Sequence, residues 1–209
     1  MASPSESLWH RNQVLAQAAL EHPFVQGIAS GELAQAAFAY YVGQDASFLD
    51  AFCRAYALAL AKSPDEDGLI AFRELLDAAA DEPRQHQGYA ARWEIDLHPV
   101  PDLATSAYTN FVLAVAALEP VGQIAAAKTP CMRLYAYLGQ HLAAQTKPEN
   151  PYREWVMTYS SEQFEALARR LEVLLDRYGG DHDRLAVLYQ QAMELELRFF
   201  DAASRWERR

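Results

Sequence analysis

The sequence predicts an all-α fold, a compact bundle of several helices. Apolar residues recur at three- and four-residue spacing along nearly the whole 209-residue chain, which is the period of an amphipathic helix. No segment shows the sustained two-residue alternation of Val, Ile and Thr that is typical of a half-buried strand. Short connectors separate many periodic segments, and this arrangement favours a bundle over a solenoid.

Ten helices are predicted from the periodic segments in chain order. They cover residues 6–20, 23–30, 33–62, 66–80, 82–93, 103–118, 120–144, 151–158, 162–178 and 182–206. Turn-forming and capping residues mark several of their ends. In the segment Ser63-Pro64-Asp65, proline cannot continue the preceding helix, and the aspartate can accept hydrogen bonds from the first free N–H groups of the next one.

Three further boundaries are predicted in the second half of the chain. The segment 98–102 contains two prolines and is expected to be an extended connector. Ser160, with Gln163 three residues later, predicts a capping box at the start of a helix. Gly179 and Gly180 predict the end of that helix after Tyr178.

Length and composition indicate one soluble domain over residues 1–209. A hydrophobic fraction of 51% with 11% aromatic residues excludes a disordered chain. No apolar run approaches the roughly 18 residues that a membrane span needs, so no membrane partner is expected. The net charge of −10 and the pI near 5.0 argue against a nucleic-acid partner, because phosphate binding requires clustered Lys and Arg.

The first eleven residues have no basic segment followed by an apolar one, so a cytoplasmic location is expected. Without a secretory context, Cys53 and Cys131 are predicted to be free thiols. The six histidines are scattered, and neither Cys-x-x-Cys pairs nor the Glu-x-x-His spacing of helical di-iron sites occurs, which disfavours a metal or haem site. Glu82 and His86 lie one turn apart and are interpreted as a surface ion pair.

Two carboxylates interrupt apolar helix faces. Asp45 shares a face with Phe38, Tyr41, Phe48, Leu49, Phe52 and Tyr56. Glu196 shares a face with Leu185, Leu188, Tyr189, Ala192, Phe199, Phe200 and Ala203. Burying a carboxylate costs several kcal/mol unless it is hydrogen-bonded, so each group either has a structural partner or belongs to a reactive pocket. The structural alternatives are a Tyr, an Arg or a helix N-terminus for Asp45 and a buried Arg for Glu196.

Cys131 is the third reactive residue on an inward face. It follows Pro130 within the predicted helix 120–144 and shares a face with Leu134, Tyr135 and Leu138. Because proline cannot donate to the carbonyl of Ala126, a bend is expected there, which opens space for a ligand. A thiol is nucleophilic only as the thiolate, and the alternative is an inert buried thiol, which is how Cys53 is interpreted. Asp45, Cys131 and Glu196 together predict a reactive pocket between the three helices.

Five short segments resemble successive blocks of the TenA / thiaminase II family. They are HPFVQGI at 22–28, YYVGQD at 40–45, PCMRLY at 130–135, TYS at 158–160 and ELRFFD at 196–201. Their order and spacing match over nearly the whole chain. The resemblance implies an all-helical fold similar to haem oxygenase, a homotetramer, a pyrimidine pocket in each subunit, and no metal or organic cofactor.

The cysteine-containing branch of that family hydrolyses 4-amino-5-aminomethyl-2-methylpyrimidine to the hydroxymethyl compound in thiamine salvage, and also cleaves thiamine. The presence of Cys131 indicates similarity to this branch. The resemblance implies that Cys131 is the nucleophile that adds to the pyrimidine ring. It also implies that Glu196 protonates a ring nitrogen and that Asp45 holds the exocyclic amine.

Four aromatic residues correspond to pocket positions of the family: Tyr108, Tyr135, Tyr159 and Phe199, the last of which is expected to pack on the substrate ring. Their alternative role is core packing. Phe48 departs from the family, which commonly has a tyrosine three residues after the aspartate. Two alternatives to the thiamine-salvage hydrolase therefore stay open, a hydrolase of a different pyrimidine and a non-catalytic pyrimidine-binding or regulatory protein.

Overall fold

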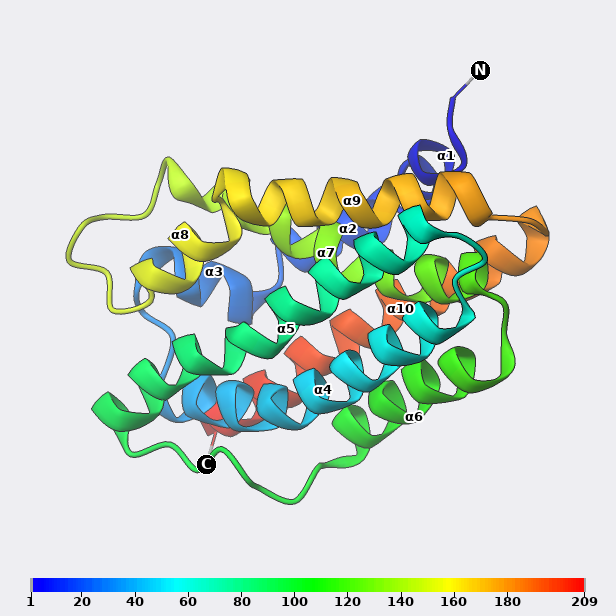
Figure 1. Ribbon diagram of the computed structural model, residues 1–209. Helices are drawn as coiled ribbons and strands as arrows, with labels where there is room; N and C mark the ends of the chain where they lie inside the picture. Colours follow the sequence, from blue (N-terminus) through cyan, green and yellow to red (C-terminus); the bar gives the residue numbers. More distant parts are fainter. Residues whose placement is uncertain (1, 209) are drawn as a thin grey trace.

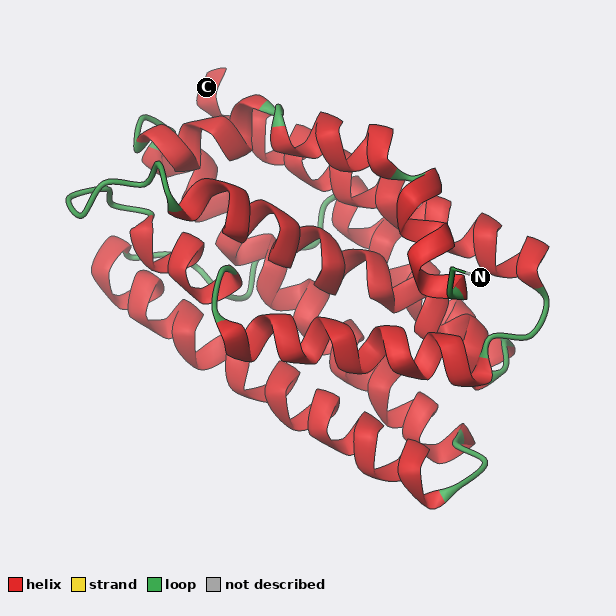
Figure 2. Cartoon of the chain, turned by 90° about the horizontal axis from the view of Figure 1, so that it is seen from above, coloured by secondary structure: helices red, strands yellow, loops and turns green. Residues whose placement is uncertain are grey.

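The computed structural model describes residues 2–208, apart from the side chains of residues 82–87, 89, 207 and 208. Every regular element in this part of the chain is a helix, which confirms the predicted all-α class (Figures 1 and 2). The elements are α1 (Pro4–Arg11), α2 (Gln13–Leu20), α3 (Pro23–Ser30), α4 (Gln35–Lys62), α5 (Glu66–Trp93), α6 (Leu103–Leu118), α7 (Val121–Ala143), α8 (Arg153–Tyr159), α9 (Glu162–Tyr178), α10 (His182–Ser204) and the 3₁₀ turn η1 (Arg205–Arg208).

Helices α4, α7 and α10 form the centre of the bundle. Helix α7 packs against α9 and α10, α4 packs against α5 and α6, and α10 contacts both α4 and α7. Figure 2 shows the long helices lying side by side with roughly aligned axes. Side chains from every turn of α7 are buried, including all of those from Val121 to Pro130. No helix among the described residues has both the length and the apolar character to cross a membrane.

The predicted helix 6–20 is two helices, because Asn12 separates α1 from α2. Its backbone leaves the helical region, at φ −102° and ψ 11°. Its side-chain amide donates to the carbonyl of Leu8 at 2.9 Å, and its N–H reaches the carbonyls of Leu8 and Trp9. An Asn side chain that binds the nearby backbone competes with helix continuation, which is the physical reason for the break.

The predicted break near Asp81 is wrong, since the segments 66–80 and 82–93 form the single helix α5. Asp65 caps its start by accepting from the N–H of Gly68 at 2.9 Å, as predicted. Helices α4 and α5 each contain 28 residues and pack against one another, so tertiary packing supports the continuous helix. The side chains of Glu82 and His86, interpreted above as an ion pair, lie outside the described residues.

The predicted cap at Ser160 is one residue early. Ser161 caps α9, with its Oγ accepting from the N–H of Phe164 at 3.1 Å, whereas Ser160 ends α8. Serine is a preferred N-cap residue, so either Ser160 or Ser161 could begin α9 on sequence grounds. The path of the chain after α8 determines that Ser161 takes this position. The predicted end of α9 is confirmed, and Gly180 adopts a left-handed φ of 89° there.

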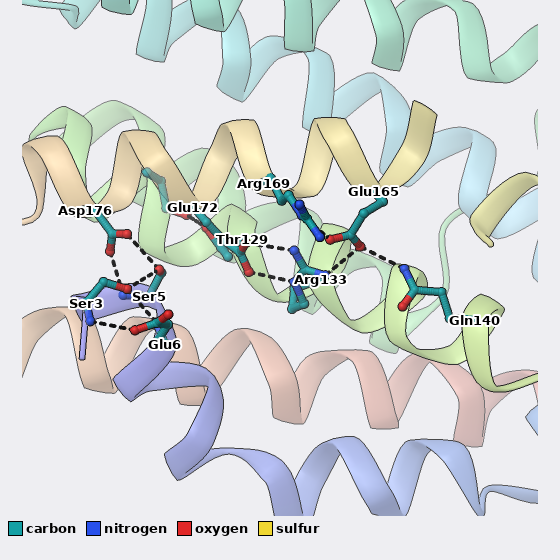
Figure 3. Close-up of polar contacts among 11 residues, drawn as sticks. Ser3, Ser5, Glu6, Thr129, Arg133, Gln140, Glu165, Arg169, Glu172 and Asp176 are labelled. Atoms are coloured by element: carbon teal, nitrogen blue, oxygen red, sulfur yellow. Dashed lines mark hydrogen bonds and ion pairs between the residues drawn. The ribbon is translucent and has the colours of Figure 1, made fainter. Parts of the chain in front are cut away.

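A partly buried ion-pair cluster ties α7 to α9 (Figure 3). Nε and Nη2 of Arg133 donate to Glu172 at 2.6 and 2.7 Å, and Nη1 donates to Glu165 at 2.8 Å. The arginine side chain is 13% exposed. Such a two-pronged arginine contact fixes geometry as well as charge, so it holds α7 in place two residues beyond Cys131.

Candidate active site

The three predicted reactive residues come from the three central helices. Asp45 lies on α4, Cys131 on α7 and Glu196 on α10. Asp45 and Cys131 line one small cavity of about 20 Å³. The full lining consists of Asp45, Phe48, Leu49, Phe52, Cys131, Met132, Tyr135, Tyr159 and Phe164. The cavity therefore brings together five residues that the resemblance assigned to a pyrimidine pocket.

Glu196 is the most deeply buried acid of the site, at 1% exposure. The Tyr108 hydroxyl donates to its Oε1 at 2.6 Å. Burial raises the pKa of Glu196 to about 7, and hydrogen bonds from Tyr108 and Cys131 oppose that rise. Among the described side chains its partners are thus a tyrosine and a cysteine rather than a buried arginine. A carboxyl with this pKa can gain or lose a proton near neutral pH.

Cys131 is half-buried and lies between the cavity and Glu196. It lines the cavity, and its hydrogen bond with Glu196 contributes to the pKa of that carboxyl. A nucleophile within hydrogen-bond reach of a base is the arrangement that covalent catalysis requires. Cys131 and Cys53 are both thiols and are not joined in a disulfide, as predicted.

Asp45 contributes a carboxylate to the cavity wall. It is 5% exposed and stands one turn before Phe48 and Leu49, which line the cavity with it. Burial raises the pKa of Tyr108 and Tyr135 well above the ordinary tyrosine value, and the charges of Glu196 and Asp45 add to that rise. Both tyrosines therefore stay protonated at neutral pH and can donate hydrogen bonds.

Tyr135 and Tyr159 form an aromatic corner of the cavity. Their ring centroids are 4.8 Å apart in an edge-to-face arrangement, and the ring of Tyr159 meets Phe164 at the same distance. The Tyr41 hydroxyl donates to that of Tyr135 at 3.2 Å. Gly139 permits this corner, because a Cβ there would lie 2.4 Å from the carbonyl carbon of Tyr159. The glycine thus lets α7 approach the end of α8.

Tyr108 and Phe199 lie behind the cavity wall. The ring of Phe48 packs against Tyr108 at 4.6 Å and faces Phe199 at 6.3 Å between centroids. Tyr108 contacts the reactive groups only indirectly, through its hydrogen bond to Glu196. The Phe199 side chain is 4% exposed and packs beside Phe48 and Tyr41. Contact between Phe199 and a substrate ring stays a prediction.

Several residues of the site were not predicted from the sequence. Leu49 and Phe52 were placed on the correct face but not in the cavity, and Met132 and Phe164 were not singled out. Lys128 was also missed, although it is fully buried one turn before Cys131. A single lysine inside the apolar helix 120–144 was the signal that could have revealed it.

A larger pocket of about 140 Å³ adjoins the cavity. Its lining includes polar groups from Asp81, Thr158, Ser161 and Gln163. The two spaces share a wall made of Phe52, Met132 and Phe164. A buried cavity of about 150 Å³ binds benzene. The cavity of about 20 Å³ is much smaller, so wall side chains must move before it can hold a pyrimidine.

The described residues contain no cluster of three or more His, Cys, Asp or Glu side chains that could hold a metal ion. The polar groups around the small cavity are instead a thiol, a carboxylate and two phenols. This set of groups suits proton transfer and nucleophilic attack.

Comparison with known proteins supports a common origin with pyrimidine-processing enzymes. The Arabidopsis thaliana protein "Bifunctional TH2 protein, mitochondrial" is 35% identical over 86% of this chain and 34% of its own length, so the chain spans about a third of that protein. The "Aminopyrimidine aminohydrolase" of Halalkalibacterium halodurans is 31% identical over 94% of this chain and 93% of its own length.

Solved structures agree with the predicted fold. A TenA homologue from P. horikoshii OT3 is 27% identical and superposes with a TM-score of 0.89, covering 98% of this chain and 100% of that one. Haem oxygenase-1 from Synechocystis, at 15% identity, superposes with a TM-score of 0.59 over 96% of this chain and 92% of its own, which confirms the likeness of fold. The sequence profile of the TENA/THI-4/PQQC family matches residues 9–206. The chain therefore belongs to the TENA/THI-4/PQQC family.

Proposed function

We propose that this protein is an aminopyrimidine hydrolase of thiamine salvage. Its reaction converts 4-amino-5-aminomethyl-2-methylpyrimidine and water to 4-amino-5-hydroxymethyl-2-methylpyrimidine and ammonia, and it also cleaves thiamine. The observation that carries the proposal is a cavity lined by the Cys131 thiol, the Asp45 carboxylate and an aromatic corner, with the buried Glu196 carboxyl hydrogen-bonded to Cys131 behind its wall. The full-length match to the Halalkalibacterium halodurans aminopyrimidine aminohydrolase supports it.

The first half of the reaction is addition of Cys131 to the pyrimidine ring. Glu196 takes the thiol proton and passes it to a ring nitrogen, so the sulfur attacks as a thiolate while the ring becomes electron-accepting. Addition breaks the aromaticity of the ring. The electron pair then expels the group on the side methylene, which leaves as neutral ammonia from an ammonium or as neutral thiazole from a thiazolium.

The second half restores the enzyme. Water adds to the exposed methylene and releases its proton to the solvent, the sulfur departs as thiolate, and the ring regains its aromaticity. Glu196 recovers the proton from the ring nitrogen, which its pKa of about 7 makes possible near neutral pH. Dividing one difficult displacement into two easier steps is the advantage of the covalent route.

Asp45 and the tyrosines orient the ring in this scheme. The Asp45 carboxylate accepts hydrogen bonds from the exocyclic amine, and Tyr135 and Tyr159 present ring edges and hydroxyls to the substrate. Tyr108 holds the Glu196 carboxyl through their 2.6 Å hydrogen bond. These roles make the site selective for an aminopyrimidine over a purely apolar ring.

A second candidate is hydrolysis of a different pyrimidine. It is favoured by Phe48, whose ring lies in the cavity wall where the family commonly has a tyrosine. The missing hydroxyl removes one hydrogen-bonding group from the pocket. The reaction class stays the same under both candidates, and only the preferred substrate differs.

The test is turnover by the purified protein. It is incubated separately with the aminomethylpyrimidine and with thiamine, and the hydroxymethyl product and ammonia are measured by mass spectrometry and an enzymatic ammonia assay. From the aminomethyl compound we expect equal amounts of the hydroxymethyl product and ammonia. From thiamine we expect the hydroxymethyl product and the free thiazole without ammonia, at a lower rate. Binding of either compound without product, unaffected by Glu196→Gln, would contradict the proposal and favour a pyrimidine-binding protein.

Three further parts of the proposal concern the whole protein. A single TenA-like domain over residues 1–209, a homotetramer and a cytoplasmic location all stay predictions. Light scattering on the purified protein tests the tetramer, because it measures the mass of the assembly directly. Fractionation of cells that express the protein tests its location.

A further inference from the structure

Lys128 is completely enclosed in the core, with 0% exposure. Lysines are almost never fully buried unless their charge is compensated. Lys128 lies three residues before Cys131 on α7, and residues three apart on a helix share a face. We propose that Lys128 is a positioning residue, which holds a buried positive charge beside Cys131 and thereby favours the attacking thiolate. This inference rests on the proposed function, because it gives Lys128 a part in that reaction.

Three contacts of Lys128 favour its charged form. Nζ donates to the backbone carbonyl of Phe52 at 2.7 Å. It also lies 3.2 Å from the centroid of the Phe52 ring and 3.5 Å from that of Tyr56. The face of an aromatic ring attracts a cation through its quadrupole, whereas a neutral amine gains little there. The protein therefore provides a place for an ammonium group inside an apolar core.

Burial and neighbouring charge act on Lys128 in opposite directions. Burial lowers the pKa of Lys128 well below its ordinary value, and the charges of Cys131 and Cys53 raise it. The interaction with Cys131 is mutual, since a thiolate that stabilises the ammonium is stabilised by it to the same extent. Two charges that are each unfavourable in the core thus support one another.

Lys128 acts through Cys131 and not on the substrate. The Phe52 side chain lines the cavity, and the ammonium lies against the same ring. Lys128 is absent from the cavity lining in the described part of the chain. The lysine therefore lies behind the Phe52 side chain in the cavity wall, and its charge interacts with Cys131.

The other titratable groups around Cys131 do not stabilise a thiolate, so a nearby cation is needed for that purpose. The titratable side chains that face the pair from the packed helices are Asp45, Cys53 and Tyr56 of α4, Tyr108 of α6, Tyr135 of α7, Tyr159 of α8 and Glu196 of α10. All of them are neutral or negative at neutral pH. Ionised carboxylates disfavour a thiolate, so a positive charge is needed to offset them.

One proton is shared between Cys131 and Glu196. When it moves from sulfur to the carboxylate, the thiol becomes a thiolate, the carboxylate becomes a carboxylic acid, and no other reagent is consumed. The charge of Lys128 acts on Cys131, and this interaction favours the form with the proton on Glu196. That form is the one ready for attack and for protonation of the ring.

The test measures the acidity of Cys131 without any substrate. The chain has two cysteines, so a Cys53→Ser parent leaves Cys131 as the only thiol. The rate of its alkylation by iodoacetamide as a function of pH reports the thiolate fraction. We expect a midpoint in this parent below the ordinary thiol value of about 8.5. Lys128→Met, which keeps an unbranched apolar chain, should raise the midpoint by about one pH unit or more.

Two variants separate charge from packing. Lys128→Arg retains the charge and should return the midpoint toward that of the parent. Lys62 is the matched control, because its Nζ also binds backbone carbonyls, those of Ala116, Ala117 and Glu119 at 2.8 Å, yet it lies about 15 Å further along α4 than Phe52. Lys62→Met should lower the stability of the fold and leave the midpoint unchanged.

A parent midpoint at or above about 8.5, or an equal midpoint in Lys128→Met, would overturn the inference. Folding of Lys128→Met is expected, because replacing a buried charge by an apolar side chain removes a desolvation cost. The alkylation assay needs no turnover. The role of Lys128 and the hydrolase activity can therefore fail independently of one another.

Discussion

Burial of Glu196 links the stability of the protein to pH. The folded-state pKa is about 7, and the ordinary value is 4.5. Because the folded state holds the proton more tightly, this stabilising effect is fully present below pH 4.5 and is lost as pH rises through 7. The same property that suits Glu196 for proton transfer thus makes the fold less stable in alkaline solution.

Glu196→Gln should therefore remove a pH-dependent loss of stability. We expect wild type to lose about 3 kcal/mol of unfolding free energy between pH 4.5 and 7, and the Gln variant to lack this loss. Urea unfolding at pH 5 and pH 8 measures it. Glu194→Gln on the same helix is the control and should behave as wild type. Parallel pH dependence in wild type and Glu196→Gln would show that Glu196 does not titrate as described.

Substitution of Phe48 tests which pyrimidine the site prefers as substrate. A hydroxyl added by Phe48→Tyr would enter a buried wall and donate a hydrogen bond to a bound pyrimidine, which corresponds to about fivefold to tenfold in kcat/KM. We expect this gain for the aminomethylpyrimidine but not for pyrimidines without a matching acceptor. Phe48→Leu, which changes the ring without adding a hydroxyl, is the control. An equal change for every pyrimidine in the panel would exclude a role in selection.

The reactive residues could be predicted from the sequence because each breaks a pattern. Asp45 and Glu196 are charges on apolar helix faces, and Cys131 follows a proline inside a helix. Lys128 also breaks a pattern, but a long side chain can carry its charge to the surface. Only the packed structure shows that Lys128 stays in the core.

Packing between helices determines where the site residues meet. The predicted limits of α3, α6 and α9 agree with the structure, although Ser161 rather than Ser160 caps α9. The continuous α5 and the break at Asn12 could not be predicted in the same way. Packing against α4 keeps α5 continuous, and the conformation of the Asn12 side chain ends α1.

The Arg133 cluster should be a strong link between α7 and α9. Arg133→Met leaves two partly buried carboxylates, Glu165 and Glu172, without their shared partner, and we expect a loss of about 2–3 kcal/mol in unfolding free energy. The matched control is Arg170→Met, since Arg170 pairs with Glu74 at a site where both side chains are more than 40% exposed. That exposed pair should contribute less than about 1 kcal/mol. Urea unfolding measures both variants. Equal losses of unfolding free energy in Arg133→Met and Arg170→Met would contradict a stronger contribution from the partly buried cluster.

At the scale of the whole molecule, access to the cavity depends on a shared wall. Phe52, Met132 and Phe164 separate the cavity from the larger outer pocket, and the cavity of about 20 Å³ has room for about one water molecule. Thiamine is larger than the aminomethylpyrimidine, so it demands more movement of the wall. The size of this wall could not be predicted from the sequence, since it depends on how side chains from three helices pack together.

Met132→Ala should widen the passage. We expect the ratio of kcat/KM for thiamine to that for the aminomethylpyrimidine to rise severalfold, at a cost of about 2–5 kcal/mol in stability. Leu167→Ala, which alters only the outer pocket, is the control and should leave the ratio unchanged. Steady-state kinetics on both substrates measures the effect. A ratio that stays constant in Met132→Ala would mean that the substrate takes another route.

The most direct test of the account compares the two cysteines in one assay. Hydrolysis of the aminomethylpyrimidine is measured for wild type, Cys131→Ser and Cys53→Ser, with helical content checked by circular dichroism. We expect Cys131→Ser to fold and to lose about three orders of magnitude or more in kcat, and Cys53→Ser to retain activity on the order of wild type. A folded Cys131→Ser protein that hydrolyses the substrate at the wild-type rate would contradict catalysis by Cys131.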